Sequence, residues 1–489
     1  MHAPVTPGTM DRVEIATETE RKYDVPETFE LPDLVGAGEI AGTDGAETHD
    51  LDATYFDTDD LRLMRNRRTL RRRSGGHDAG WHLKTPGDGV GRTEHRLNGD
   101  SETVPDELVG VVRAIVRRSP LAPVARLRTH RVETPLKDAG GRTLALVAQD
   151  QVRAESAGVE TVWQEVEVEF VAGDPAVLDE VEQRLFAAGA SPAEGPSKVS
   201  RALADRLAAE KAKAEDSGKK AKHKINPVAV YVGEQRDAIL GHDPGARQGA
   251  PRSVHQMRVA TRRLRSTLKT YRRSFGESDL RDELRWLAAV LGAVRDPQVL
   301  EEKLLGLVEE AGPEFAAAAD RVRAHLDDRI ATGRAELAEA LDSDRYLDLL
   351  DRVDELVARR PRTADPVKRA RKVLAKADVK LDAALESGVE EKIHESRKGF
   401  KQARYAVEVL APEQGRPAKR LVKALTALQD GLGAYQDSNV ARGVLRELGT
   451  DSFHFGVLYG RQEQVGRDEL AKVPELARKA RRRKVRRVF

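Results

Sequence analysis

The stretch TETERKYDV, at residues 17–25, places a charged side chain at every second position near the start of the chain. Glu18, Glu20 and Lys22 alternate with threonine, arginine and tyrosine. Because successive side chains of a β-strand point to opposite faces, two carboxylates and one ammonium would share one side of an extended chain here. Solvent is the simplest surrounding for such a face. The stretch therefore predicts a strand whose charged side faces either water or an interior that carries charge.

A later segment, WQEVEVEF, has the same alternation. Glu165, Glu167 and Glu169 share one face, and the valines and the phenylalanine between them share the other. Mixed charge on one face recurs in TLRRRSGG with Arg71 and Arg73, in WHLKTP with His82 and Lys84, and in GRTEHRL with Arg92, Glu94 and Arg96. We expect these faces to meet inside a barrel, which is tolerable only if the interior is wet, paired or filled by a charged ligand. Carboxylates with Arg and Lys suit a polyanion together with a divalent cation.

Length and composition indicate a multidomain protein. The chain has 489 residues, more than one ordinary domain, and 34% of them are charged. Its 83 Lys and Arg nearly balance 81 Asp and Glu, so basic character has to be local. With no cysteine, disulfides and thiolate metal sites are excluded. We find no signal-peptide core and no apolar run long enough for a bilayer, and we expect a cytoplasmic protein without a membrane partner.

The chain changes character near residue 206. Before it, short alternating segments such as ATYFDT, RTLALVAQD and TVWQEVEVEF predict strands, and DPAVLDEVEQRLFAAGA predicts a helix. Residues 207–224 are polar and predict a linker or an exposed helical connection. Long Ala-, Leu-, Arg- and Glu-rich segments follow, which indicate a helical bundle. We therefore predict an α+β domain at 11–206, a linker at 207–224, an all-α domain at 225–470 and a basic tail at 471–489.

The helical half contains a repeat. HQMRVATRRLR and HESRKGFKQAR match in spacing and charge, so that His255, Arg258, Arg262 and Arg265 correspond to His394, Arg397, Lys401 and Arg404. Further on, LGAVRDPQVL matches LGAYQDSNVA in the same order. Two matched blocks predict duplicated helical units related by a pseudo-twofold axis.

The first of these blocks forms a basic stripe. Residues 251–273 contain eight Lys or Arg and no acid, and their spacing of three and four places most of them on one helix face. Like charges on one face repel one another, so the stripe implies an anionic partner or neighbouring acids. The second copy is incomplete, because Glu408 stands where Lys269 would recur. For the basic end, RKARRRKVRRVF, we favour a disordered, solvated tail over an extension of the polyanion site or a nucleic-acid contact.

The first half resembles the CYTH domains, the triphosphate tunnel metalloenzymes. Glu18, Glu20 and Lys22 match the ExExK signature, and YFDTDDLRL, TLRRR, WHLK, RTEHR and EVEVE follow in the family's order over residues 13–206. The resemblance implies an antiparallel β-tunnel with flanking helices. It also implies hydrolysis of inorganic triphosphate, thiamine triphosphate or nucleoside triphosphates, or cyclisation of ATP. Residues 226–469 resemble CHAD domains, which implies that inorganic polyphosphate binds along a basic surface built from both repeats.

The resemblance assigns residues to roles. Metal, as Mg²⁺ or Mn²⁺, would be held by Glu18, Glu20, Asp150, Glu165 and Glu167, with Glu169 a further candidate. Phosphates would be held by Lys22, Arg71, Arg73, Lys84 and Lys198, and by Arg131, with which Arg128 competes because the register of RLRTHR is open. Glu94 would lie along the tunnel and join Glu18, Glu20 and Lys22 in catalysis. Polyphosphate would be held by His255, Arg258, Arg262, Arg265, His394, Arg397, Lys401 and Arg404, with Arg263 and Lys398 in weaker roles.

Three functions fit these patterns. The first is a metal-dependent triphosphatase whose helical domain captures polyphosphate. The alternative is a non-catalytic protein that binds polyphosphate with both domains. A nucleic-acid binder fits worst, because duplex DNA needs no carboxylate cage and no aromatic stacking pattern accompanies the arginines. The sequence leaves open which triphosphate is the substrate and what the oligomeric state is.

Overall fold

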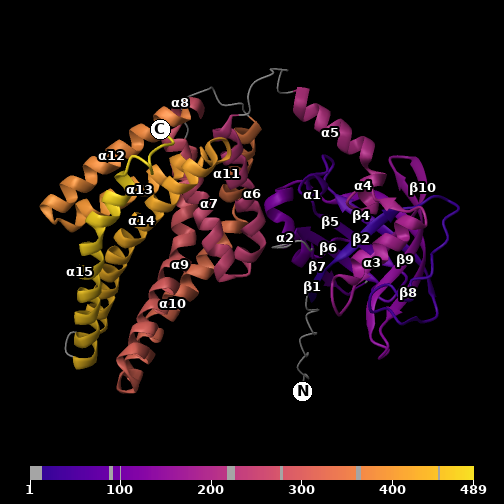
Figure 1. The fold of residues 1–489 in the computed structure, drawn as a ribbon, viewed down its shortest axis with the longest axis horizontal. Coiled ribbons are helices and arrows are strands. Elements are labelled where there is room, and N and C mark those ends of the chain that lie inside the picture. The colour runs from indigo at the N-terminus through magenta and orange to yellow at the C-terminus, as the bar shows by residue number, and fades with distance from the viewer. Residues whose placement is uncertain are drawn as a thin grey trace, which may run out of the picture. The chain divides into compact units, whose positions relative to one another are not determined.

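A computed structural model describes residues 14–86, 92–99, 101–216, 226–275, 279–358, 365–449 and 452–489. The chain forms two compact units, Met1–Lys219 and Lys220–Phe489. The first contains the strands and the second is helical (Figure 1). This agrees with the predicted fold class, an antiparallel β-tunnel followed by a helical bundle. Within the described residues, no helix is both long and apolar enough to span a membrane.

The described strands form one antiparallel sheet in the order β1-β7-β6-β5-β4-β8-β9-β10-β2-β11, with β3 paired to β8. They are β1 (Glu14–Glu18), β2 (Glu20–Asp24), β3 (Gly42–Thr43), β4 (Glu47–Asp57), β5 (Thr69–Ser74), β6 (Gly80–Pro86), β7 (Arg92–Leu97), β8 (Ala122–Lys137), β9 (Thr143–Ser156), β10 (Val159–Phe170) and β11 (Ser191–Pro192). The helices of this unit are α1 (Arg62–Arg65), α2 (Asp106–Val116), α3 (Val177–Ala187), α4 (Lys198–Ala202) and α5 (Ala204–Asp216).

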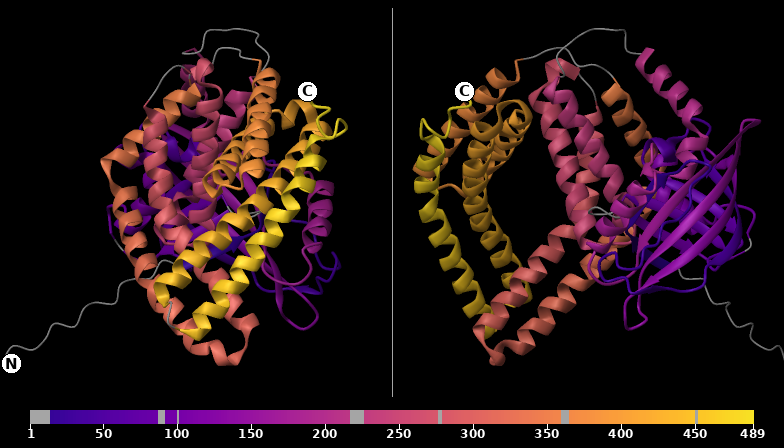
Figure 2. Two further views of the ribbon diagram at one scale, coloured as in Figure 1. Left: turned by 90° about the vertical axis from the view of Figure 1, so that its left-hand side faces the viewer. Right: turned by 45° about the vertical axis from the view of Figure 1, so that its right-hand side comes forward.

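The opening stretch closes this sheet into a tunnel. The strand predicted there is two strands, because the chain changes partner at Thr19: β1 pairs with β7, and β2 pairs with β10. β1 lies at one end of the sheet order and β2 near the other, yet only Thr19 separates them in the chain. The sheet therefore curves around a common interior (Figure 2, right).

Alternation decides which side chains face that interior. Val166 and Val168 of β10 are fully buried beneath α3, where they pack with Leu178, Val181 and Leu185. Glu165, Glu167 and Glu169, which alternate with those valines, must then point to the other side of the strand, into the tunnel. The hydrophobic layer under α3 thus fixes the inward direction of the β10 carboxylates.

The second unit consists of helices, most of them long. They are α6 (Pro227–Arg247), α7 (Pro251–Thr270), α8 (Arg272–Phe275), α9 (Leu280–Ala311), α10 (Ala316–Asp342), α11 (Asp344–Ala358), α12 (Pro366–Ser387), α13 (Glu390–Glu408), α14 (Ala411–Leu448, kinked at Gly415) and α15 (Phe453–Arg481). Their starts are encoded locally: the side chains of Asn226 and Asp365 cap α6 and α12, and each of these helices begins with proline.

The two copies of the repeat use the same packing device. Arg258 of α7 lies against Gly292 of α9, where an added Cβ would come within 3.2 Å of its guanidinium. Arg397 of α13 lies in the same way against Gly433 of α14, at 3.0 Å. The glycine of each LGA motif therefore leaves room for the arginine of the paired helix, and α7 packs directly on α13.

The C-terminal tail is ordered, so the expectation of a disordered, solvated tail was wrong. Helix α15 continues into the tail as far as Arg481. Beyond the helix, Val488 is buried and Phe489 packs against the hydrophobic core of α12–α15. Arg486 donates two hydrogen bonds to Asp378, at 2.7 and 2.9 Å. Burial of Val488 and Phe489, together with the pairing of Arg486 with Asp378 on α12, outweighs the repulsion between the basic side chains of the tail. In the predicted linker, α5 extends to Asp216, and 217–225 lie outside the described residues.

Candidate active site and basic surface

The tunnel encloses a cavity of about 350 Å³ with a strongly charged lining. Its charged members come from strands all around the sheet and from the start of α4, and include Glu20, Lys22, Arg71, Arg73, Lys84, Arg96, Arg131, Glu133, Glu167, Glu169 and Lys198. Most phosphate-binding candidates predicted from the sequence therefore line one cavity. The mixture of cations and carboxylates matches the expected surroundings of a triphosphate with a metal ion.

Three buried carboxylates meet on one side of the tunnel. Asp150 of β9 is the cross-strand partner of Glu165 in β10, and Glu167 follows on the same face. Oxygen atoms of all three lie within 4.8 Å of one another. The ammonium of Lys198, the first residue of α4, lies 2.8, 2.7 and 2.6 Å from Asp150, Glu165 and Glu167. Burial opposes ionisation, but Lys198 and Arg131 hold the pKa of Asp150 and of Glu167 below the usual carboxyl value.

Arg131 supports the same cluster from β8. Its Nε and Nη2 atoms donate to the two oxygens of Asp150 at 2.8 and 2.7 Å, and Nη2 also donates to Glu167 at 2.6 Å. Arg128 lies on the opposite face of β8, 57% exposed, with Nε 3.7 Å from Asp52. Strand parity therefore separates the two arginines that the sequence left in competition, and only Arg131 reaches the tunnel.

The opening stretch supplies Glu20 and Lys22 to the cavity. The Lys22 ammonium lies 3.1 Å from Glu20 and also contacts Glu167. Burial and the charge of Glu167 act against ionisation of Glu20, but Lys22 and Lys84 hold its pKa below the usual value. Glu169 is the cross-strand partner of Glu20 and lines the same cavity. Glu18 ends β1 opposite Arg92, and its side chain lies outside the described residues.

The opposite wall of the tunnel is cationic. Arg71 donates to the Tyr55 hydroxyl at 3.4 Å, and Arg73 contacts Asp78. Burial and the charges of Arg71 and Arg131 lower the pKa of Arg73, which shows that these guanidinium groups repel one another. A bound polyanion would relieve that repulsion.

Glu94 does not line the cavity but lies behind it. Its carboxylate is 1% exposed, contacts Arg96 and lies 3.0 Å from His82 Nδ1 and 3.8 Å from the Lys84 ammonium. It therefore positions the cations around it. We expected a place along the tunnel for this residue.

The helical unit has two adjoining basic hollows. The first, of about 340 Å³, is lined by seven cations, and no acid is among its described lining residues: Arg262, Arg265, Lys269, Arg281, Arg285, Lys398 and Lys401. The second, of about 430 Å³, shares Lys269 and Arg281 and adds Arg272, Arg369, Lys372, Lys376 and Lys380. We call these two hollows together the basic surface. Sequence reasoning missed Arg281 and Arg285, because Asp282 and Glu283 between them cancel the net charge of that turn of α9.

The remaining predicted stripe residues lie beside the basic surface rather than in it. Arg258 forms two hydrogen bonds with Asp296 at 2.6 and 2.7 Å. Arg404 lies 3.5 Å and Arg263 3.0 Å from Glu408. His394 Nδ1 lies 3.0 Å from the Gln436 side-chain oxygen. The pKa of His255 is lowered by burial and by nearby arginines, including Arg295. Of the predicted stripe residues, Arg262, Arg265 and Lys401 line the first hollow.

Lys401 is the most perturbed cation of this group. Burial and the neighbouring charges of Arg397, Arg262 and Arg258 lower its pKa to about 7, against a smaller opposing effect of Asp437. Arg262 also has a lowered pKa, through burial and the charges of Arg258 and Arg397. The two repeats therefore concentrate uncompensated positive charge where α7 and α13 meet.

A charged antiparallel tunnel followed by a two-repeat helical unit with a basic surface defines the class of the protein. Residues 16–203 match the CYTH domain and residues 230–446 match the CHAD domain. The chain belongs to the family of proteins in which a CYTH domain is followed by a CHAD domain, as the sequence motifs predicted. CYTH domains are triphosphate tunnel metalloenzymes.

The chain is similar to several proteins over all or part of its length. Uncharacterized protein Rv2226 of Mycobacterium tuberculosis (strain ATCC 25618 / H37Rv) is 36% identical over 514 residues, covering 95% of this chain and 98% of its own. PptA from Streptomyces chartreusis is 18% identical with a TM-score of 0.45, covering 52% of this chain and 98% of its own. The CHAD domain of the plant Ricinus communis is 24% identical with a TM-score of 0.40, over 51% of this chain and 88% of its own.

The metal that CYTH domains use is compatible with the residues present. Asp150, Glu165 and Glu167 offer only oxygen donors, which Mg²⁺ and Mn²⁺ prefer. The cluster already stabilises a positive charge, since the ammonium of Lys198 lies among its oxygens. Of these three carboxylates, Glu167 lines the cavity, as do Glu20 and Glu169.

Proposed function

We propose that the tunnel hydrolyses inorganic triphosphate or a related triphosphate with Mg²⁺ or Mn²⁺, and that the basic surface of the helical unit binds polyphosphate. The observation that carries the proposal is that Arg71, Arg73 and Lys84 line the same cavity as Glu20 and Glu167. Phosphate-binding cations and metal-binding carboxylates are thus within reach of one small polyanion.

In this proposal, Lys22, Arg71, Arg73, Lys84, Arg131 and Lys198 bind and orient the phosphate oxygens. Glu18, Glu20, Asp150, Glu165 and Glu167 hold the metal, with Glu169 beside Glu20, and the bound metal would neutralise charge on the phosphates. Catalysis of phosphoryl transfer depends mainly on positioning and charge neutralisation. Glu94 keeps its neighbours Arg96, Lys84 and His82 in place, and a tunnel carboxylate orients the attacking water.

A non-catalytic polyphosphate-binding protein is the second candidate. One observation favours it: Lys198 and Arg131 together make five close contacts with Asp150, Glu165 and Glu167. If those ion pairs persist with substrate bound, the acidic cluster neutralises cations of the chain instead of holding a metal. The tunnel would then bind phosphates without turnover.

A phosphate-release assay distinguishes the two candidates. The full-length protein is given inorganic triphosphate, thiamine triphosphate or ATP, each with Mg²⁺ or with Mn²⁺. For any substrate that is hydrolysed, Glu20→Gln should lower kcat by about 100-fold or more, because charge stabilisation in the tunnel is lost. Glu160→Gln is the matched control, since Glu160 is exposed on β10 and pairs with Arg153. No release from any of the three, with tight polyphosphate binding, would favour the non-catalytic candidate.

A further inference from the structure

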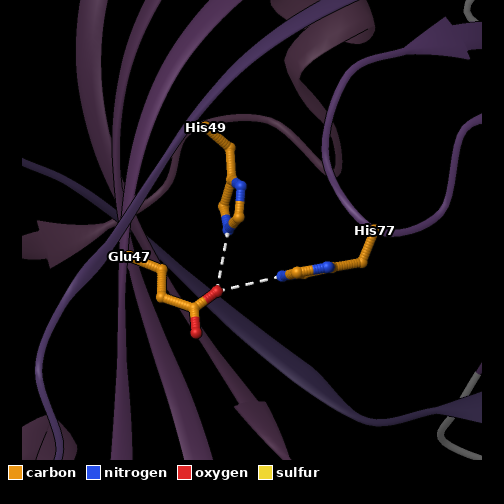
Figure 3. Close-up of side chains that lie close together, drawn as sticks. All are labelled: Glu47, His49 and His77. Atoms are coloured by element: carbon orange, nitrogen blue, oxygen red, sulfur yellow. Dashed lines mark hydrogen bonds and ion pairs between the residues drawn. The ribbon is translucent and has the colours of Figure 1, made fainter.

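Two histidines and a glutamate converge at one side of the tunnel cavity (Figure 3). Nε2 of His77 lies 3.0 Å from Oε2 of Glu47, and Nε2 of His49 lies 3.7 Å from the same oxygen. The two imidazole rings meet edge to face with centroids 4.8 Å apart. All three atoms that could bind a metal therefore point toward one small region.

The fold explains how these residues meet. Glu47 and His49 are two apart in β4 and share its inward face, while His77 lies in the turn between β5 and β6. Both histidines line the tunnel cavity. Glu47 and His77 are exposed at 61% and 75%, whereas His49 is only 15% exposed. The cluster is thus anchored on a strand and open to solvent on one side.

Two features of the cluster remain unsatisfied by the chain alone. The Nε2 atom of His49 is buried and makes no hydrogen bond with any described residue. Glu47 lies directly opposite Glu133 in the β4–β8 pairing, so two carboxylates face each other across the strands. Like charges in such positions are destabilising. A cation between the histidines and Glu47 would bond the orphaned nitrogen and offset the repulsion.

We propose that Glu47, His49 and His77 form a binding site for a divalent transition metal of the Zn²⁺ class. Two imidazole nitrogens and one carboxylate oxygen are a donor set that suits Zn²⁺ and related ions, whereas Mg²⁺ prefers oxygen alone. Three protein ligands leave a fourth position open. Because the site borders the tunnel cavity, an oxygen of a phosphate in that cavity is the natural fourth ligand. This site is separate from the carboxylate cluster around Lys198.

A simpler account is that Glu47 merely accepts a hydrogen bond from His77. The chain provides a control for it: His130 Nδ1 lies 2.8 Å from Asp50 on the other face of the same strand pair. That pair has similar partners and exposure, and no third donor joins it among the metal-binding groups of the described residues. Only the Glu47 cluster should therefore hold a metal.

The test is calorimetric titration of tag-free, full-length protein with Zn²⁺, in excess Mg²⁺ to compete for the all-oxygen sites. We expect His77→Ala and Glu47→Gln to lose one bound Zn²⁺ or to bind it at least about tenfold more weakly. Loss of an outer-shell partner alone costs about 10–100-fold in metal affinity, and these residues are proposed as direct ligands. His130→Ala should match the wild type. With Co²⁺ as the probe, the visible absorption of a tetrahedral site should appear in the wild type and be lost in His77→Ala.

Because His77 is exposed in a turn, its replacement should leave the fold intact, and circular dichroism checks this. Equal Zn²⁺ uptake by the wild type and His77→Ala would overturn the site. So would an equal loss in His130→Ala, since it would indicate general binding to surface histidines.

Discussion

The ammonium of Lys198 lies 2.6 Å from Oε1 of Glu167. Asp150 and Glu165 contact the same ammonium, so one lysine neutralises much of the acidic cluster. Lys198 is fixed there by its position as the first residue of α4, directly after the capping residue Ser197. The metal-binding carboxylates that we propose therefore already enclose a cation that belongs to the chain.

Replacing Lys198 by Met should destabilise the sheet unit and make it responsive to metal. Removing one partner from a buried ion pair costs about 3–5 kcal/mol, because the other charges are left unpaired. The position of the lysine ammonium among the three carboxylates would then be open to a divalent ion, so Mn²⁺ should restore part of the loss. The measurement is urea unfolding followed by fluorescence in a Trp286→Phe background, which leaves only Trp81 and Trp163, both in the sheet unit.

Lys213→Met is the control for this prediction. Lys213 is 73% exposed on α5 and, among the residues described, forms an ion pair with Glu210, three residues before it. Its replacement should change neither stability nor the response to Mn²⁺. If Lys198→Met unfolds at the wild-type urea concentration without metal, the ion pairs around Lys198 contribute little.

The carboxylates of the cluster predict a pH dependence of stability. The pKa values of Asp150 and Glu167 are lowered in the folded protein by Lys198, Arg131 and, for Glu167, Lys22. A lowered carboxyl pKa stabilises the fold above the unfolded value, about pH 4, and this contribution is lost as the pH falls toward the folded value. The destabilisation caused by Asp150→Asn should therefore be largest near neutral pH and shrink below about pH 4. A pH-independent difference in unfolding free energy between wild type and Asp150→Asn would contradict this.

Reversing charge in the basic surface should remove polyphosphate binding. Arg262 and Arg265 line the first hollow, and hydrogen bonds to charged groups are worth about 1.5–3 kcal/mol each. Arg262→Glu with Arg265→Glu should thus weaken long-chain polyphosphate by about 100-fold, with helicity unchanged. Arg323→Glu with Lys472→Glu is the matched control, because both residues are exposed on helices and lie outside the hollows.

The same surface should prefer polyphosphate over DNA. Both affinities should fall with salt, since both are largely electrostatic. Polyphosphate is flexible and densely charged, so it can follow two adjoining hollows, whereas duplex DNA has a fixed shape. The measurement is displacement of labelled polyphosphate by equal phosphate concentrations of unlabelled polyphosphate or of duplex DNA. If DNA displaces the label equally well, the basic surface is a general polyanion site.

Period-two alternation was sufficient to predict the inward face of the tunnel. Glu20, Lys22 and Glu167 point inward because the other face of each strand contacts α3: Arg21 and Tyr23 of β2 bond to Glu182, and the valines of β10 are buried under that helix. Arg131 and Arg128 could not be separated, because the register of β8 depends on pairing with distant strands. Glu94 alternates like its neighbours but is covered by His82, Lys84 and Arg96, and only the packing shows this.

Contacts between segments far apart in sequence were beyond such reasoning. His77 lies in a turn 28 residues after His49, and no local pattern joins them. The ordered tail was missed because its basic composition hid the two apolar residues at its end and their partner core. By contrast, the helical repeat was visible, because spacing on a helix is local and both copies keep the same Arg–Gly contact.

Lys401 should make polyphosphate binding depend on pH. Its pKa is lowered to about 7 by burial and by Arg397, Arg262 and Arg258, so the free protein carries a partly neutral lysine near neutral pH. A bound polyanion favours the charged form, and binding should therefore take up a proton. Affinity should rise as the pH falls from about 8 to about 6, by up to about tenfold for one proton. Fluorescence titration with long-chain polyphosphate, whose internal phosphates do not titrate in this range, measures the effect.

Lys401→Arg keeps the charge at every pH in this range, so its affinity should be high and nearly pH-independent, whereas Lys401→Met should bind weakly throughout. An unchanged pH dependence in Lys401→Arg would contradict the role of Lys401.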